Sequence, residues 1–253
     1  MMGKEGFSES AEGGVLSLGS LRYRIRPLRA DDLHSLGECF LRLSTTSRRH
    51  RFLGTKRALS DMELEYFSNA DQCDHIALAA LALDEAGAEH ALYGAARCFR
   101  LAPGGADAEL SIAVADTAQG IGLGGQLLAR LIETARGQGI HRFVFEVMES
   151  NTAMRALAAR FGSKTRSLFA GVVSYELLLS EVALSDAEPQ RPVGKGASFA
   201  ELERAWLSAS EQQARFGSLV AEITVDWMRL LDPASRFDSI LQQSGRESTP
   251  TTD

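Results

Sequence analysis

The sequence predicts an α/β (α+β) fold in which a mixed central sheet is flanked by helices, followed by one long C-terminal helix. Three observations support this fold class. Apolar and alternating segments typical of strands dominate the first half of the chain. Between about residues 109 and 180, strand and helix patterns alternate, an order that favours a sheet with helices packed on its faces. Beyond Ser180 the composition changes, and one long amphipathic segment follows from Ser198 to Leu231.

Composition and charge restrict the possible functions. The chain has 253 residues, of which 45% are hydrophobic and 24% are charged, as in an ordinary folded protein. A net charge of −6 argues against nucleic acid as a partner. Three separated cysteines and five isolated histidines show no metal-ligand spacing, so we expect neither a metal nor a disulfide framework. The first 20 residues contain no long apolar run, so we expect no signal peptide, no membrane partner and a cytoplasmic location.

The first half of the chain carries most of the predicted strands. Alternation or continuous apolar runs place strands at residues 23–27, 76–83, 91–99 and 109–115. Asp31 can cap a first helix, and a second helix is expected at residues 61–67. Between them, the polar turn at residues 44–47 leads into the basic run at residues 48–52. Two interpretations of that run remain open: it could shape the mouth through which the acceptor enters, or it could be a charged loop whose Phe52 is anchored in the core.

The second half alternates helices and strands. A helix is predicted at residues 124–136 because its apolar residues recur at helical spacing and glycines follow it. A strand is expected at residues 142–148 and a helix from Asn151 to about residue 160, which Gly162 ends. A last strand is expected at residues 172–179.

These elements divide the chain into five segments. Residues 1–20 are expected to form a disordered leader because they are rich in glycine and serine. Residues 21–181 form the predicted catalytic domain. Residues 182–197 are predicted to be a linker because prolines, glycines and charges cluster there. Residues 198–232 form the long amphipathic helix, and residues 233–253 a flexible tail.

A glycine-rich turn is the motif that predicts chemistry. Residues 119–125 read Gln-Gly-Ile-Gly-Leu-Gly-Gly and lie between an apolar strand and an amphipathic helix. Glycines allow a tight turn that brings several backbone N–H groups together, and the helix start adds unpaired donors and partial positive charge. Such a turn suits a pyrophosphate. Gly120, Gly122 and Gly125 also satisfy a dinucleotide-binding pattern, but too few elements follow them for a doubly wound sheet.

The same turn resembles the acyl-CoA signature of the GNAT N-acetyltransferase superfamily, Q/R-x-x-G-x-G/A, which Gln119, Gly122 and Gly124 fill. Four segments extend the resemblance to the acetyltransferase domain of bacterial protein lysine acetyltransferases: YRIRPLRADDLHSLGECFLRLSTTSRRHRFLG, ALYGAARCFR, AELSIAVADTAQGIGLGGQLLARLIETARGQGI and FEVMESNTAMRALAARFG. This resemblance implies the GNAT fold over about residues 21–180 and acetyl-CoA as co-substrate.

The resemblance also implies the site residues. Glu109 is expected to be the general base, with Glu146 as a competitor that is more simply explained as a buried anchor paired with an arginine. The cofactor is expected to contact the backbone of Ile112 and Val114 and the side chain of Asn151, which can also cap a helix. The glycine turn supplies the remaining expected cofactor-binding residues, which are Gln119, Gly120, Gly122, Leu123, Gly124 and Gly125.

Three positions depart from the superfamily pattern. Ala158 stands where many members carry a tyrosine that protonates the leaving thiolate, Ile121 where arginine is common, and Ala118 where an aromatic residue is common. Arg155, Arg160 and Lys164 could serve the phosphates instead, although a solvated helix face explains them equally simply.

The predicted function is acetyl transfer from acetyl-CoA to an amine by direct attack, since no cysteine lies in a nucleophile context. The resemblance implies a protein lysine as the acceptor. Two alternatives remain open at this point. The acceptor could be a small amine, or the protein could be a non-catalytic acyl-CoA sensor or interaction module.

The predicted C-terminal helix carries an apolar seam. Its seam residues repeat at alternating spacings of three and four: Phe199, Leu202, Trp206, Ala209, Gln213, Phe216, Val220, Ile223, Trp227 and Leu230. This heptad-like pattern favours a helical partner, and a homodimer is the simplest one. Two alternatives remain open: the helix could fold back onto its own domain, or it could form an intramolecular hairpin if Gly217 breaks it.

We expect the full-length chain to be a dimer in light scattering and a version ending near Glu188 to be a monomer, because truncation removes the seam. A full-length chain that stays monomeric at high micromolar concentration would rule out the dimer. Loss of acetyl-CoA binding on truncation would show instead that the helix completes the catalytic domain.

Overall fold

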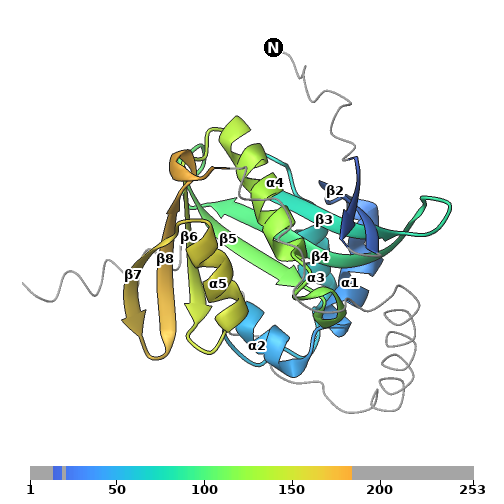
Figure 1. Cartoon of the computed structure of the whole chain (residues 1–253), viewed down its shortest axis with the longest axis horizontal. Coiled ribbons are helices and arrows are strands. Elements are labelled where there is room, and N and C mark those ends of the chain that lie inside the picture. Colours follow the sequence, from blue (N-terminus) through green and yellow to red (C-terminus); the bar gives the residue numbers. More distant parts are fainter. Residues whose placement is uncertain (1–13, 19–20, 184–253) are drawn as a thin grey trace, which may run out of the picture. The chain divides into compact units, whose positions relative to one another are not determined.

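The computed structural model describes residues 14–18 and 21–183 (Figure 1). The predicted linker beyond residue 183, the long helix at residues 198–232 and the tail at residues 233–253 lie outside the described residues. Within those described, no helix is long and apolar enough to cross a membrane.

In the part of the chain that the structure describes, eight strands form one mixed sheet in the order β1-β2-β3-β4-β5-β6-β8-β7. The strands are β1 (Val15–Leu18), β2 (Leu21–Pro27), β3 (His75–Leu83), β4 (Glu89–Arg100), β5 (Asp107–Val114), β6 (Arg142–Met148), β7 (Lys164–Phe169) and β8 (Val172–Leu178). Neighbouring strands pair antiparallel except β5 and β6, which run parallel. The mixed sheet predicted from the sequence is therefore confirmed.

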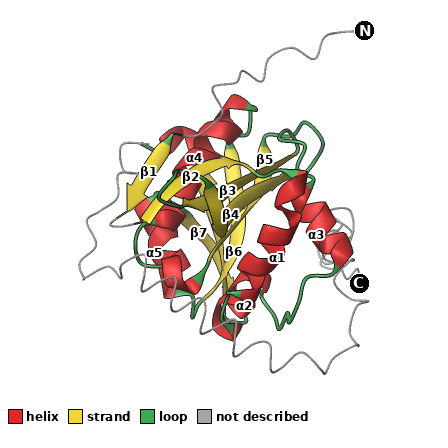
Figure 2. Cartoon of the chain, turned by 90° about the vertical axis from the view of Figure 1, so that its right-hand side faces the viewer, coloured by secondary structure: helices red, strands yellow, loops and turns green. Residues whose placement is uncertain are grey.

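Helices cover both faces of this sheet (Figure 2). They are α1 (Leu33–Leu41), α2 (Thr45–Phe52), α3 (Asp61–Ser68), α4 (Leu123–Gly137) and α5 (Thr152–Arg160), with 3-10 turns at Ala30–Asp32, Asp116–Ala118 and Leu179–Glu181. Figure 1 shows α4 and α5 in front of the sheet and α1 and α3 behind it. Every residue of β3 is buried, as expected for a central strand covered on both faces.

Four local expectations were wrong. Val15–Leu18, assigned to a disordered leader, forms β1 and pairs with β2, since a short apolar segment can add to an open sheet edge. The basic run at residues 48–52 is helical rather than a loop, because Ser44 caps α2 by accepting a hydrogen bond from the Ser47 N–H at 3.1 Å. Asp32 rather than Asp31 lies at the start of α1.

The fourth is β7, an edge strand that was not predicted. All six of its residues are exposed, so the strand lacks the alternation of apolar and polar side chains by which strands are recognised.

A buried ion-pair network fixes the start of α1 against β2. The Arg26 guanidinium donates to both carboxylate oxygens of Asp32, at 2.7 and 2.8 Å, and pairs with Glu89 at 2.8 Å. Arg26 and Asp32 are only 4% and 6% exposed. Burial by itself would raise the pKa of Asp32, but hydrogen bonds from Arg26 and from the Arg29 N–H outweigh it and lower that pKa below 3.8.

Replacing Asp32 by Asn should lower the free energy of unfolding by about 3 kcal/mol, because the buried Arg26 then loses its best partner. The contribution of a carboxylate whose pKa is lowered on folding is fully present above the unfolded value and is lost as the pH falls through the folded one. The stability difference between Asp32→Asn and the parent chain should therefore shrink below pH 3.8. Urea titrations of both proteins at several pH values measure this difference in the free energy of unfolding.

The control is Glu181→Gln, which removes the exposed pair with Lys164 and should cost less than about 1 kcal/mol. Equal effects of the two substitutions would contradict the special role of the buried network.

Candidate active site

The parallel strands β5 and β6 separate soon after they meet. Their pairing covers only Asp107–Glu109 on β5 and Arg142–Val144 on β6, although both strands continue. Because Ala115 N–H bonds to Tyr93 on the β4 side at 2.8 Å, the alternation of an antiparallel ladder directs the backbone groups of Ile112 and Val114 away from β4, toward the opening. A ligand can therefore bond to this backbone, as the sequence analysis expected of these two residues.

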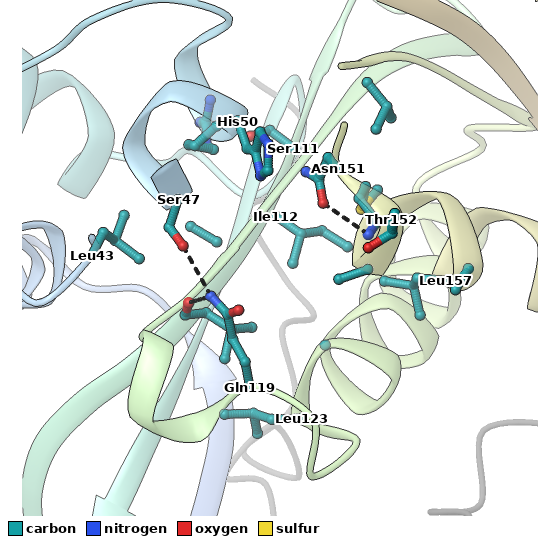
Figure 3. A pocket seen from close by; sticks show the side chains of 18 of the residues that line it. Leu43, Ser47, His50, Ser111, Ile112, Gln119, Leu123, Asn151, Thr152 and Leu157 are labelled. Carbon is teal, nitrogen blue, oxygen red and sulfur yellow. Dashed lines mark hydrogen bonds between the residues drawn. The ribbon is translucent and has the colours of Figure 1, made fainter. Parts of the chain in front are cut away.

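A cavity of about 930 Å³ fills the space where the strands separate. Its walls come from α2, β5, the glycine turn, β6 and α5 (Figure 3). It is lined by all of the sequence-predicted site residues, namely Glu109, Glu146, Ile112, Val114, Gln119, Gly120, Gly122, Leu123, Gly124, Gly125 and Asn151. The structure thus brings together residues from the strand, the turn and the following helices.

The glycine turn has the geometry of an anion site. Gly120 and Gly122 have φ angles of +75° and +98°, a conformation that glycine adopts without strain. Gly122 is the N-cap of α4, and its carbonyl accepts the first bonds of that helix from Gly125 and Gln126. The N–H groups just before and at the helix start have no partner inside the helix and carry its partial positive charge. Pyrophosphate oxygens are natural partners for such groups.

Gln119 connects the glycine turn to β5 and α2. Its side-chain Nε2 donates to the Val114 carbonyl at 2.9 Å, to Asp116 Oδ1 at 3.2 Å and to Ser47 Oγ at 3.3 Å (Figure 3). The other carboxylate oxygen of Asp116 accepts from the Ser44 N–H at 3.2 Å, at the start of α2. In this structure Gln119 therefore positions the cavity wall.

Asn151 caps α5. Its Oδ1 accepts from the Met154 N–H at 3.0 Å, which leaves the side-chain amide at the cavity wall (Figure 3). Just before it, Ser150 Oγ lies 3.1 Å from His50 Nε2, a contact that joins α2 to the loop after β6. The cap explains why an asparagine stands here, and its place at the cavity is compatible with a contact to a ligand.

The two candidate carboxylates differ in their surroundings. Glu109 is half-buried on β5, where the pairing with β6 ends. Glu146 is exposed on β6 beyond that point and, within the described residues, makes no ion pair. The expectation that Glu146 is covered on both faces and paired with an arginine was wrong, because the separation of the strands uncovers it.

Thr46, Ser47, His50 and Arg51 line the cavity from one face of α2, at the spacing that brings helical side chains together. His50 and Arg51 belong to the basic run that could shape the acceptor mouth, whereas Thr46, Ser47 and Ser111 were not predicted from the sequence. Ser111 Oγ is buried at the wall and finds no hydrogen-bond partner among the described residues. The residue types of these three carried no signal, because only the fold brings α2 to β5.

The basic residues near the glycine turn separate into two kinds. Arg160 lines the cavity, and a Cβ added to Gly125 would lie 3.2 Å from its guanidinium nitrogen. Arg155 donates instead to the Glu149 carbonyl at 3.2 Å, and Lys164 pairs with Glu181 at 3.2 Å. Arg160 is therefore the one of these three side chains that the structure brings to the cavity.

The positions that depart from the superfamily pattern are packed. Ala158 is fully buried and Ala118 is 1% exposed, while Ile121 packs against the core. No tyrosine lies at the position of Ala158, so a proton for the leaving thiolate comes from elsewhere.

Comparison with known proteins agrees with this geometry. The model of the acetyltransferase (GNAT) family matches residues 47–162. Acetyltransferase PA5475 of Pseudomonas aeruginosa is 31% identical over 138 residues, which are 54% of this chain and 73% of that protein. Acetyltransferase Pat of Mycolicibacterium smegmatis is 27% identical over 168 residues, 66% of this chain but only 49% of that protein.

Among solved structures, the GNAT domain of S. lividans PAT superposes with a TM-score of 0.59 at 28% identity, covering 68% of this chain and 99% of that domain. The separated strands, the glycine turn at a helix start and these relatives lead to one conclusion. The chain belongs to the GNAT family and is an N-acetyltransferase whose co-substrate is acetyl-CoA.

Proposed function

We propose that the protein transfers the acetyl group of acetyl-CoA to a protein lysine, with Glu109 as general base. The observation that carries this proposal is the place of Glu109, half-buried in the cavity at the point where β5 and β6 separate. The GNAT domain of S. lividans PAT and the resemblance to bacterial protein lysine acetyltransferases support the choice of acceptor.

The cofactor extends from the glycine turn along β5. The pyrophosphate binds the N–H groups at the start of α4, and Arg160 beside Gly125 adds a positive charge. The pantetheine arm lies between the separated strands, where the backbone groups of Ile112 and Val114 face the opening. The Asn151 side chain contacts the arm from the start of α5.

The reaction is a direct displacement. The neutral amine attacks the thioester carbonyl, forms the new C–N bond and gives its proton to Glu109, directly or through water. The C–S bond then breaks, and the CoA thiolate leaves with its electron pair. With Ala158 at the position of the usual tyrosine, the thiolate takes its proton from solvent.

Replacing Gly124 by Val should weaken CoA binding at least tenfold, because the new side chain projects into the cavity beside the turn. A Cβ at this position would meet Leu157 at 3.7 Å and Val114 at 3.8 Å, which is ordinary contact, so the fold should persist. Calorimetry with CoA measures the affinity. Gly137→Ala, near the far end of the same helix and in open space, is the control. Unchanged affinity in folded Gly124→Val would refute this cofactor site.

Replacing Glu109 by Gln should keep CoA binding and lower turnover by about a hundredfold or more, the usual scale for a general base. The assay follows acetyl-CoA consumption with a mixture of lysine peptides and, separately, with small amines. Glu146→Gln is the matched control, since it changes the other candidate base of the cavity. A near-parent rate for Glu109→Gln with a large loss for Glu146→Gln would assign the base to Glu146. Turnover of small amines without turnover of any peptide would show that the acceptor is a small amine rather than a protein lysine.

A further inference from the structure

The last turn of α2 brings an arginine into the half of the cavity that contains Glu109. Arg51 and Glu109 both line the cavity, and their charges attract each other. The opposite end of α2 is tied to the glycine turn, because Ser47 contacts Gln119. Arg51 lies one helical turn beyond Ser47, so α2 runs from the cofactor's phosphate end toward Glu109.

The Arg51 guanidinium makes few polar contacts within residues 14–18 and 21–183. It donates no hydrogen bond and makes no ion pair there, and its Cζ lies 4.7 Å from the centroid of the Phe52 ring. Arg48 on the same helix is different, because it donates to three backbone carbonyls. A guanidinium has five N–H donors in a planar fork that suits a carboxylate, and in Arg51 no other described residue accepts from them.

Among the described residues, two charged side chains act on Arg51. Burial lowers the pKa of Arg51 to about 10, with Glu109 acting in the opposite direction. Burial and the charge of Arg51 lower the pKa of the neighbouring Arg97 to about 9. Both arginines remain charged at neutral pH, and Arg97 is held by the Phe67 carbonyl at 3.2 Å. Arg51 therefore lies near a carboxylate that attracts it and a cation that repels it, so an anion bound at Arg51 would be attracted to this end of α2.

This anion is not a phosphate of the cofactor. Glu109 and Val114 are five residues apart on β5, which corresponds to roughly 17 Å of extended strand. The glycine turn follows beyond Val114. Because Arg51 is attracted by Glu109 at the far end of that strand, an anion held by Arg51 beside Glu109 belongs to the ligand that approaches Glu109, which is the acceptor.

We propose that Arg51 binds a carboxylate of the acceptor, so that the enzyme selects an amine with an anionic group close to it. This inference rests on the proposed function, in which Glu109 receives the amine. The ammonium of the arriving acceptor faces Glu109, and its carboxylate faces Arg51. In a protein the carboxylate comes from an acidic side chain beside the lysine. In a free amino acid it is the α-carboxylate.

Two matched pairs of acceptors test this selection. One pair is a lysine peptide flanked by Glu and the same peptide flanked by Gln. The other is free lysine and lysinamide. The parent enzyme should favour the carboxylate member of at least one pair by about tenfold or more in kcat/KM, the scale of a charge-assisted contact. Arg51→Gln should bring this ratio near one, and Arg51→Lys should keep part of it.

The matched control is Arg49→Gln. Arg49 is an exposed arginine on the same helix, outside the cavity lining, so its loss should leave the ratio unchanged. Thermal melting establishes that each variant folds. Because turnover also depends on Glu109, calorimetry of both peptides with the CoA-loaded protein gives a second readout, in which the Glu peptide should bind more tightly only when Arg51 is present.

The outcomes that contradict the inference can be distinguished from those that contradict the proposed acceptor. Peptides acetylated without regard to Glu or Gln, with no preference between lysine and lysinamide, would overturn the role of Arg51 and leave the protein-lysine acceptor standing. Preference for free lysine over lysinamide, with no peptide turnover, would support the binding of a carboxylate by Arg51. It would also show that the acceptor is a free amino acid rather than a protein lysine. Equal peptide affinities in calorimetry together with an unchanged ratio in Arg51→Gln would overturn the inference.

Discussion

The site depends on the short pairing between β5 and β6. Two parallel strands that stayed bonded over their full length would satisfy each other's backbone and leave no opening. Here the ladder ends at Glu109 and Val144, so the rest of β5 turns backbone groups that β6 does not pair toward the cavity. Buried backbone groups without partners are costly, and a ligand with its own donors and acceptors relieves that cost. The remaining walls, from α2 and α5, close around this one opening.

The fold could be inferred from the sequence to a large extent, because its signals are local. The apolar run of β3, the stripe of α4 and the glycine turn at residues 119–125 each reflect a constraint that acts within one element. The edge strand β7 was missed because an exposed strand needs no apolar face. The helix α2 was missed because its sequence is short and basic, and a single cap at Ser44 decided between loop and helix.

Only part of the site could be inferred from the sequence, because only some of its residues carry a local signal. Residues on the glycine turn and on β5 are defined by the motif and by their distance from it along the chain. The basic run with His50 and Arg51 could be offered for the acceptor mouth from the sequence, but its place beside Glu109, like that of Ser111, depends on which elements the fold brings together. The exposure of Glu146 has the same origin, since a strand that looks central by composition is uncovered where its neighbour departs. The two glutamates have the same residue type, and it is the tertiary arrangement that leaves Glu109 half-buried and Glu146 exposed.

The hydrogen bonds around Asp116 have a thermodynamic consequence. One oxygen of this carboxylate accepts from the start of α2 and the other from Gln119, which precedes the glycine turn. The helix that carries Arg51 and the loop that precedes α4 thus share Asp116 as an anchoring point. If occupation of the loop stiffens that anchor, the helix is stiffened with it, and part of the ordering cost of the second ligand has already been met. Linkage is reciprocal, so each substrate would then raise the affinity of the other by the same factor.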